Sequence, residues 1–316
     1  MRTSMRSPRV LAFLLALSLA PDLQAQEKKP APSAAPKQKS FATAREAADA
    51  LVAAAESFDT VALGDILGPD GESLVVTGDA VQDKTWAAEF AAAARRKSSV
   101  EVDPKNAARA TFLVGEEAWP LPIPIVKKGG KWRFLSAAGH KELAARRIGR
   151  NELDAIELCR GYVEAQREYS MTKREGSALN QYAQRILSTP GKQDGLAWQN
   201  PDGTWGGPVG ETIARSIEGG YKDRSEPYHG YYFKVLKGQG PAARLGEMDF
   251  VVKGMMIGGF ALVAAPAEWG VSGVKTFIVS HEGVVYEKDL GKKTLELFRS
   301  MERFNPDKGW IPLPEN

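Results

Sequence analysis

The sequence of 316 residues has one cysteine and three histidines, so it is poor in the side chains that carry most metal and redox chemistry. The lone Cys159 cannot form an intramolecular disulfide, and no local motif marks it as a nucleophile, so we expect a small buried side chain. None of His140, His229 and His281 falls in a metal-ligand spacing. The sequence therefore predicts no metal site and no cofactor.

The common nucleotide-binding and serine-nucleophile motifs are also absent. There is no Gly-x-x-x-x-Gly-Lys loop and no Gly-x-Gly-x-x-Gly turn after a strand. Ser272 lies in Gly-Val-Ser-Gly, which lacks the spacing of a nucleophile elbow. The net charge is +3, of which residues 1–25 with three Arg and one Asp contribute +2. A nearly neutral remainder is not built to bind nucleic acid.

No apolar run is long enough to span a membrane. The longest, Val10–Ala20, is far shorter than the ~20 residues that a spanning helix needs. Three arginines precede it and the small residue Ala25 follows, which is typical of a secretory signal peptide over residues 1–25. We expect export to the periplasm or the exterior, with no stable membrane anchor after cleavage. An uncleaved N-terminal anchor is the alternative.

The chain after the signal peptide divides by composition. Residues 26–40 contain Pro, Ala and polar residues without a large apolar side chain, so we expect a disordered linker. The remaining stretch of about 275 residues exceeds the usual size of a single core. Two domains are expected, one over residues 41–149 and one over residues 150–316.

The first domain is expected to place helices before an antiparallel sheet. Helices are predicted over residues 44–57, 60–67 and 83–96, the first with Thr43 and Glu46 as a capping box. Strands are predicted over residues 107–114, 121–126 and 131–135, the last two as a hairpin. This order resembles the cystatin-like cone of nuclear-transport-factor-2-like proteins, which can hold a small ligand. Glu116 and Glu117 could share a proton or bind a cation there, or form a solvated loop.

The second domain is expected to be a helix followed by an antiparallel sheet. A long helix is predicted from Asn151, as its N-cap, to about Lys173, and the next 50 residues or so form loops with helices at 178–187 and 208–217. The predicted strands cover residues 231–236, 249–253, 256–264, 276–279 and 284–288. A last helix covers residues 294–304, and an irregular tail follows it. The fold class is therefore α+β.

Two groups of residues are candidates for a binding or catalytic site. Trp198 and Trp205, among Gly- and Pro-rich loops, could line a groove for a sugar or an aromatic ligand, or could pin long loops to the core. His229, with Tyr228 and Tyr231 beside it, could be a general base or contact a ligand. It could equally be a structural histidine, because one histidine without a partner is not a site. Glu226 or Asp249 would be its carboxylate partner.

Several longer motifs resemble the bacterial exported family called domain of unknown function 2950 (DUF 2950). The most specific are Arg-Ile-Gly-Arg-Asn-Glu-Leu at 147–153, Pro-Tyr-His-Gly-Tyr-Tyr-Phe at 227–233 and Met-Ile-Gly-Gly-Phe-Ala-Leu-Val-Ala at 256–264. Two others are Gly-Val-Ser-Gly-Val at 270–274 and Gly-Val-Val-Tyr-Glu-Lys-Asp-Leu at 283–290. The resemblance covers nearly the whole chain after the signal peptide, and it implies no activity and no catalytic residue.

The C-terminal half is also similar in pattern to the soluble regions of type IV pilins and pseudopilins. One helix, a loop-rich middle and a Gly-Tyr-Tyr-Phe strand carry this similarity. Pilins have their processing site and apolar spine at the start of that helix, whereas this helix is predicted in mid-chain. A pilin-like fold is therefore expected without assembly into a pilus.

Three functions of different classes remain open at this point. The leading one is a non-enzymatic exported protein that acts through contacts with an envelope or secreted protein. The second is a small-ligand binder, in the N-terminal cone or at the loops of Trp198 and Trp205. The third is a hydrolase centred on His229. Thermal unfolding with a panel of ligands separates the first from the others.

Overall fold

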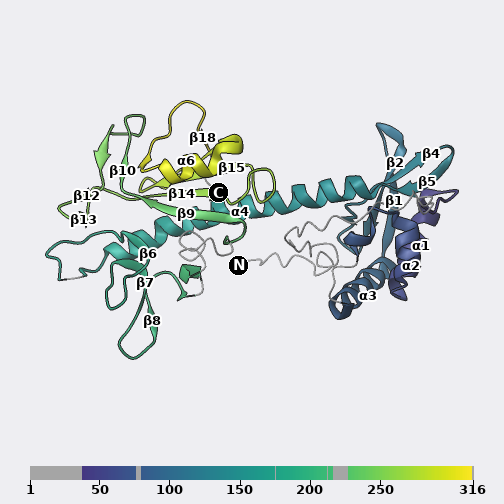
Figure 1. Ribbon diagram of the computed structural model, residues 1–316, viewed down its shortest axis with the longest axis horizontal. Helices are drawn as coiled ribbons and strands as arrows, with labels where there is room; N and C mark the ends of the chain where they lie inside the picture. Colours follow the sequence, from purple (N-terminus) through teal and green to yellow (C-terminus); the bar gives the residue numbers. More distant parts are fainter. Residues whose placement is uncertain (1–37, 76–79, 175, 212, 216–226, 315–316) are drawn as a thin grey trace, which may run out of the picture. The chain divides into compact units, whose positions relative to one another are not determined.

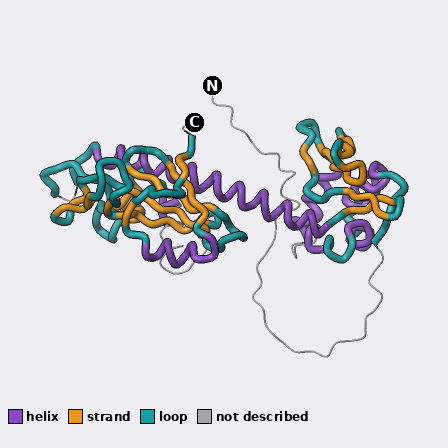
Figure 2. The backbone as a smooth tube through the Cα atoms, turned by 90° about the horizontal axis from the view of Figure 1, so that it is seen from above, coloured by secondary structure: helices purple, strands orange, loops and turns teal. Residues whose placement is uncertain are grey.

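The computed structural model describes residues 38–75, 80–174, 176–211, 213–215 and 227–314. The predicted signal peptide and residues 26–37 of the predicted linker lie outside this part of the chain. Two compact units divide the chain, one ending at Ala145 and the other running from Arg146 to Asn316. Each unit has its own helices and its own antiparallel sheets (Figures 1 and 2), and the fold class is α+β, as predicted.

The N-terminal unit begins earlier than the composition predicted. The Gln38 side chain donates to the backbone carbonyls of Ile66 at 3.0 Å and Phe134 at 2.8 Å. Lys39 donates its backbone N–H to Asp65 at 2.8 Å. Residues 38–40 therefore belong to the folded unit rather than to the linker, because their amides bind backbone groups of the core.

Three helices form the first half of this unit: α1 (Ala44–Glu56), α2 (Thr60–Leu67) and α3 (Ala80–Arg96). Thr43 caps α1, since its hydroxyl accepts from the backbone N–H of Glu46 at 3.1 Å. The Glu46 carboxylate accepts from the N–H of Ala42, one residue before the expected partner. The capping box is thus confirmed on its Thr43 side only.

The sheet of this unit has the order β1-β2-β4-β5, with β3 paired to β2. Its strands are β1 (Ser98–Asp103), β2 (Asn106–Val114), β3 (Trp119–Pro120), β4 (Ile125–Lys128) and β5 (Lys131–Phe134). Strand β1 was missed, because Ser-Ser-Val-Glu-Val-Asp is largely polar and none of it is buried. Phe112, Ile125 and Phe134 are at most 1% exposed, and Phe90 of α3 packs edge-on against Phe112.

The long helix α4 covers Ser136–Ser170, so it begins 15 residues before the predicted cap at Asn151. Helix formers such as Glu142, Ala144 and Ala145 extend it, and Gly149 does not end it. Asn151 lies inside the helix, and its side-chain amide donates to the backbone carbonyl of Ser272 at 2.8 Å. Its role is to bind a loop of the same unit, and it caps no helix.

The C-terminal unit is built on a five-stranded antiparallel sheet with the order β18-β16-β15-β14-β9. Its strands are β9 (Tyr231–Leu236), β14 (Ala261–Pro266), β15 (Lys275–Ser280), β16 (Val285–Asp289) and β18 (Ile311–Pro312). Leu262, Val263, Phe277 and Ile278 have no exposed surface, and helix α6 (Thr294–Ser300) lies beside β14 (Figure 1). The predicted irregular tail is wrong in part, because β18 pairs with β16.

Smaller sheets complete this unit. They are β6 (Arg185–Leu187), β7 (Gly195–Gln199) and β8 (Trp205–Gly206); β10 (Gly238–Gln239), β11 (Met248–Asp249) and β17 (Arg303–Phe304); and β12 (Val251–Val252) with β13 (Met255–Met256). The helix predicted at 178–187 is wrong, since β6 occupies its end. The last helix stops at Ser300 because residues 303–304 pair with β10. The predicted strand 256–264 is broken at Gly258 and Gly259.

The helix predicted at 208–217 is present in part. Residues 211 and 213–215 are helical, and residues 212, 216 and 217 lie outside the described part of the chain. Among the described residues, no helix combines the length and the apolar character needed to cross a membrane.

Candidate functional site

The candidate site begins at a tight turn before β9. His229 and Gly230 both have positive φ, 47° and 75°, and Tyr231 donates its N–H to the carbonyl of Tyr228 at 3.0 Å. Two successive positive φ values are characteristic of a type I′ turn. Gly230 is required here for a second reason, because a Cβ would lie 2.6 Å from the Asn151 side chain. The sequence Tyr-His-Gly-Tyr therefore fixes His229 at the tip of the turn.

His229 is paired with a carboxylate from α4. Its Nδ1 lies 2.5 Å from Oδ2 of Asp154, and its ring stacks on Tyr228 with centroids 4.4 Å apart. An ionised carboxylate only accepts hydrogen bonds, so Nδ1 carries the proton and Nε2 is the ring nitrogen available to a ligand. The side chains of His229 and Asp154 are 50% and 32% exposed, so the pair can be reached from solvent.

A cavity of ≈ 410 Å³ adjoins this pair and is called here the α4 cavity. One face of α4 forms its floor with Asp154, Glu157, Leu158, Gly161, Tyr162 and Ala165. The other walls are Ile186 and Leu196 of β6 and β7, the segment Pro208, Val209, Gly210 and Ile213, and the turn residues Tyr228 and His229. Its volume and its largely apolar lining with a few convergent polar groups are typical of small-molecule sites.

Gly161 is one of the residues that line this cavity. A Cβ built on Gly161 has no atom within 4 Å, so the missing side chain leaves space above the helix. Glycine inside a helix costs about 1 kcal/mol relative to alanine. A close contact with a sheet therefore does not explain this glycine. Gly161 lines the cavity, and the absence of a side chain there leaves the space next to it open.

Three lining residues were missed as site residues by reasoning from the sequence: Asp154, Glu157 and Gly161. In the sequence, an apolar stripe that begins at Leu153 would put Asp154 and Glu157 on the opposite, solvated face of the helix. In the structure Leu153 is 68% exposed, so the stripe does not begin there. The spacing of i, i+3 and i+7 for 154, 157 and 161 puts them on one helical face. That spacing was the available signal.

Trp198 and Trp205 line a different groove, of ≈ 660 Å³, with Lys192 and Arg215. Trp198 is only 8% exposed, and its indole N–H donates to Asn200 at 3.1 Å. Gly206 and Gly207 press on the Trp198 ring, since a Cβ on either would lie under 3 Å from it. Trp198 thus holds the β7–β8 loop against the core. The guanidinium of Arg215 lies over the half-buried ring of Trp205, 4.8 Å from the ring centre.

Tyr231 is a packing residue rather than part of the cavity wall. It is 1% exposed, and its hydroxyl donates to the carbonyl of Lys275 at 2.8 Å. Burial, reinforced by the nearby carboxylate of Glu152, raises the pKa of this phenol. The hydroxyl therefore stays protonated and holds the turn on β15.

Cys159 is buried on α4, as predicted. It has no exposed surface, and burial raises the pKa of its thiol from 9.0 to about 12. Because the thiolate is the reactive form, Cys159 is inert in the folded protein.

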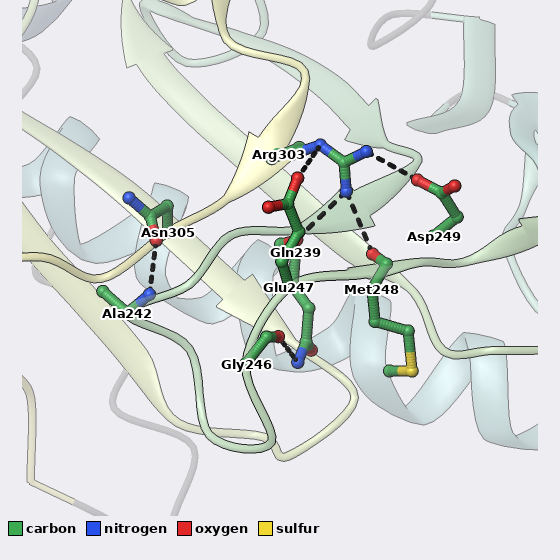
Figure 3. Close-up of polar contacts among 8 residues, drawn as sticks. All are labelled: Gln239, Ala242, Gly246, Glu247, Met248, Asp249, Arg303 and Asn305. Atoms are coloured by element: carbon green, nitrogen blue, oxygen red, sulfur yellow. Dashed lines mark hydrogen bonds and ion pairs between the residues drawn. The ribbon is translucent and has the colours of Figure 1, made fainter.

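The predicted carboxylate partners of His229 are not its partner in the structure. Asp249 pairs instead with Arg303, at 2.6 Å (Figure 3). Arg303 also donates to the carbonyls of Gln239 and Met248, so this cluster joins β10, β11 and β17. Glu226 lies outside the described residues. The observed partner, Asp154, is 75 positions away in the sequence.

The remaining candidates lie elsewhere. Glu116 and Glu117 are exposed in the turn after β2, and Glu116 forms an ion pair with Lys97 at 3.1 Å, which matches the solvated-loop reading. His140 binds the carbonyl of Asp70 at 2.6 Å, and His281 packs between Phe250 and Phe260. Within the described part of the chain, no three His, Cys, Asp or Glu side chains are grouped so that they could hold a metal ion.

Comparison with known protein families gave one match. A family model with the description "Protein of unknown function (DUF2950)" matches residues 38–313. The match begins at Gln38, whose side chain binds the N-terminal core. Neither the curated proteins nor the solved structures gave a match. The cystatin-like and pilin-like resemblances of the two units therefore stay predictions.

Proposed function

This chain belongs to the DUF2950 family, and we propose that it is an exported protein that binds a small, largely apolar molecule in the α4 cavity. The observation that carries the proposal is Gly161, which leaves open space beside α4 at a cost to helix stability. Apolar side chains surround that space, and the pair of His229 and Asp154 lies at its rim.

The small-ligand binder was the second function left open by the sequence, and the site proposed for it here is a different one. The sequence located it in the N-terminal cone or at the loops of Trp198 and Trp205. The N-terminal sheet is packed with buried side chains from its helices, and Trp198 is held in the core of its loop. The leading prediction, contacts with an envelope or secreted protein, stays a prediction, and cross-linking in the cell envelope is its test.

Thermal unfolding of residues 26–316 with a panel of apolar amines, acids, alcohols and envelope saccharides tests the proposal. A ligand at 100 times its Kd stabilises its unit by about 2.7 kcal/mol. For a unit of this size that raises Tm by roughly 5–10 °C.

The matched variants are Gly161→Leu and Gly149→Leu. Both glycines lie inside α4 with no atom near the added Cβ, but only Gly161 lines the cavity. We expect a compound that raises Tm for the wild type and for Gly149→Leu, and that fails to do so for Gly161→Leu. A panel without effect, or a shift that Gly161→Leu leaves unchanged, would overturn the proposal.

A hydrolase is the second candidate, and the 2.5 Å contact between His229 and Asp154 favours it. Such a pair can activate water: Nε2 of His229 takes a proton from water, the hydroxide attacks an ester carbonyl, and the proton leaves with the alcohol. Asp154→Asn and His229→Ala would then both abolish turnover of phenylbutyl acetate while leaving Tm unchanged. A wild-type protein that leaves this ester intact would count against it.

A further inference from the structure

We infer that the α4 cavity selects a cationic ligand, an amine with an apolar body about 10 Å long. This inference rests on the proposed function, because it names the chemical class that the same cavity takes. It draws on the distribution of charge along α4, the aromatic side chains at the rim and the absence of a lining Lys or Arg among the described residues.

Acidic groups outnumber basic groups among the described residues that line the cavity. Its described lining residues include two carboxylates, Asp154 and Glu157, and one imidazole, His229. With His229 neutral these three groups sum to −2, and with His229 protonated they sum to −1. The described part of the lining is therefore negative in either state of the histidine. An anionic ligand would be repelled, whereas a protonated amine would be attracted.

The polarity also changes along the helix. Asp154 and Glu157 stand one turn apart on the face of α4 that lines the cavity, and Leu158, Gly161 and Ala165 follow toward its C-terminus. At 1.5 Å per residue, Glu157 and Ala165 are separated by roughly 12 Å along the axis. A ligand that places its charge by Glu157 and its body over Gly161 needs one polar end and an apolar remainder of about that length.

The rim adds an aromatic surface next to the carboxylates. Tyr228 and His229 stack at 4.4 Å, with planes 25° apart, and both line the cavity. Aromatic faces attract ammonium groups, and this attraction adds to that of nearby carboxylates. Glu157 is exposed on α4, so its carboxylate can meet a ligand without breaking a core contact.

The probes are 4-phenylbutylamine, 4-phenylbutanol and 4-phenylbutyrate, which share one apolar body and differ in the charge of the head. Calorimetric titration into residues 26–316 is expected to rank them amine, alcohol, carboxylate, with the amine at least tenfold tighter than the carboxylate. Raising the salt concentration from 50 mM to 500 mM should weaken the amine and leave the alcohol nearly unchanged.

Glu157→Gln and Glu168→Gln are the matched variants. Both remove an exposed carboxylate from α4, but only Glu157 lines the cavity. We expect Glu157→Gln to weaken the amine roughly two- to fivefold, as for a solvent-exposed charge pair, and Glu168→Gln to have no effect.

The failures of the two proposals can be told apart. Equal affinities of the amine, the alcohol and the carboxylate, with all three lost in Gly161→Leu, would overturn the charge selection and leave the cavity as the binding site. Binding that Gly161→Leu does not change would overturn both. If none of the three binds, the inference is wrong, and the wider panel with Gly161→Leu decides whether the proposed function stands.

Discussion

His229 is held in a left-handed backbone conformation that costs a non-glycine residue free energy and that few of them adopt. Gly230 completes the turn, and Tyr231 anchors it under β15 through the bond to Lys275. Strain of this kind persists where surrounding contacts hold it, and it gathers at functional positions. At the scale of single residues, the turn directs one imidazole onto Asp154 at the rim of the α4 cavity.

Gly230→Ala should destabilise the C-terminal unit by about 2–5 kcal/mol. The positive φ costs about 1–2 kcal/mol for a non-glycine residue, and the contact with Asn151 at 2.6 Å adds an overpacking cost of about 1–3 kcal/mol. Gly246→Ala is the control, because Gly246 has a φ of 77° and open space at its Cβ. Urea denaturation measures both, and equal losses would show that the contact with Asn151 carries no cost.

Burial of Cys159 should make the free energy of unfolding fall as the pH rises above 9. Its pKa is about 12 in the folded chain and about 9 when unfolded, so above pH 9 the unfolded chain releases a proton that the folded chain keeps. Stability contributed by the protonated thiol is complete below pH 9 and is lost as pH rises toward 12. Between pH 9 and 11 the wild type should lose up to about 1.4 kcal/mol per pH unit more than Cys159→Ala. Parallel curves for the two proteins would contradict the buried, protonated thiol.

Contacts between residues far apart in the sequence limited how much of the site could be predicted. His229 and Tyr228 were identified because a histidine among tyrosines stands out in the sequence. Asp154 was not paired with His229, since the turn that joins them depends on Gly230, Asn151 and Ser272, which meet only in the fold. Gly161 could not be recognised as a cavity residue, because the space above it depends on β6 and β7, strands that were not predicted.

At the scale of elements, α4 holds Ala183 through the side chain of Gln166. The amide of Gln166 makes the two backbone hydrogen bonds that a neighbouring strand would otherwise make. Gln166 is fully buried, and its amide both donates to the carbonyl of Ala183 and accepts from its N–H, each at 2.8 Å. Tyr182 donates its N–H to the carbonyl of Met256. These bonds hold residues 182–183 extended, which is why the helix predicted there does not form and why β6 becomes a wall of the α4 cavity.

Gln166→Leu should destabilise the unit by roughly 2–6 kcal/mol. It leaves the buried N–H and carbonyl of Ala183 without partners, at about 1–3 kcal/mol for each group. Gln184→Leu is the control, because Gln184 makes one exposed bond to the carbonyl of Gly254. We expect a loss below about 1 kcal/mol for that variant in urea denaturation. Similar losses of stability in the two variants would show that the amide of Gln166 does not position β6.

The elements that the sequence predicted correctly have strong local signals. Helix α2 and strands β9, β15 and β16 were placed within a residue, because caps, β-branched runs and turn glycines mark their ends. Strands β7 and β8 and the early start of α4 were missed. Strand β7 reads Gly-Leu-Ala-Trp-Gln and is buried on nearly all sides, so it lacks the alternation that marks a strand.

At the scale of the whole molecule, the family match and the α+β fold leave the place of action as a prediction. Expression of the full chain in a bacterial host is expected to give an exported protein that begins at Gln26, as read by mass spectrometry of the intact chain. A variant without residues 2–25 should remain in the cytoplasm. An intact N-terminus in the cytoplasmic fraction would contradict export.

The central claim is that open, ligand-accessible space lies above Gly161. Gly161→Cys places a thiol in that space, and the inert Cys159 leaves it as the only reactive one. The measurement is the labelling rate of Gly161→Cys and of Gly149→Cys by a small maleimide in the folded protein. We predict that both thiols react, and that a compound from the panel at 100 times its Kd slows Gly161→Cys about 100-fold and leaves Gly149→Cys unchanged. A thiol at 161 that does not react, or that the compound fails to protect, would contradict the account.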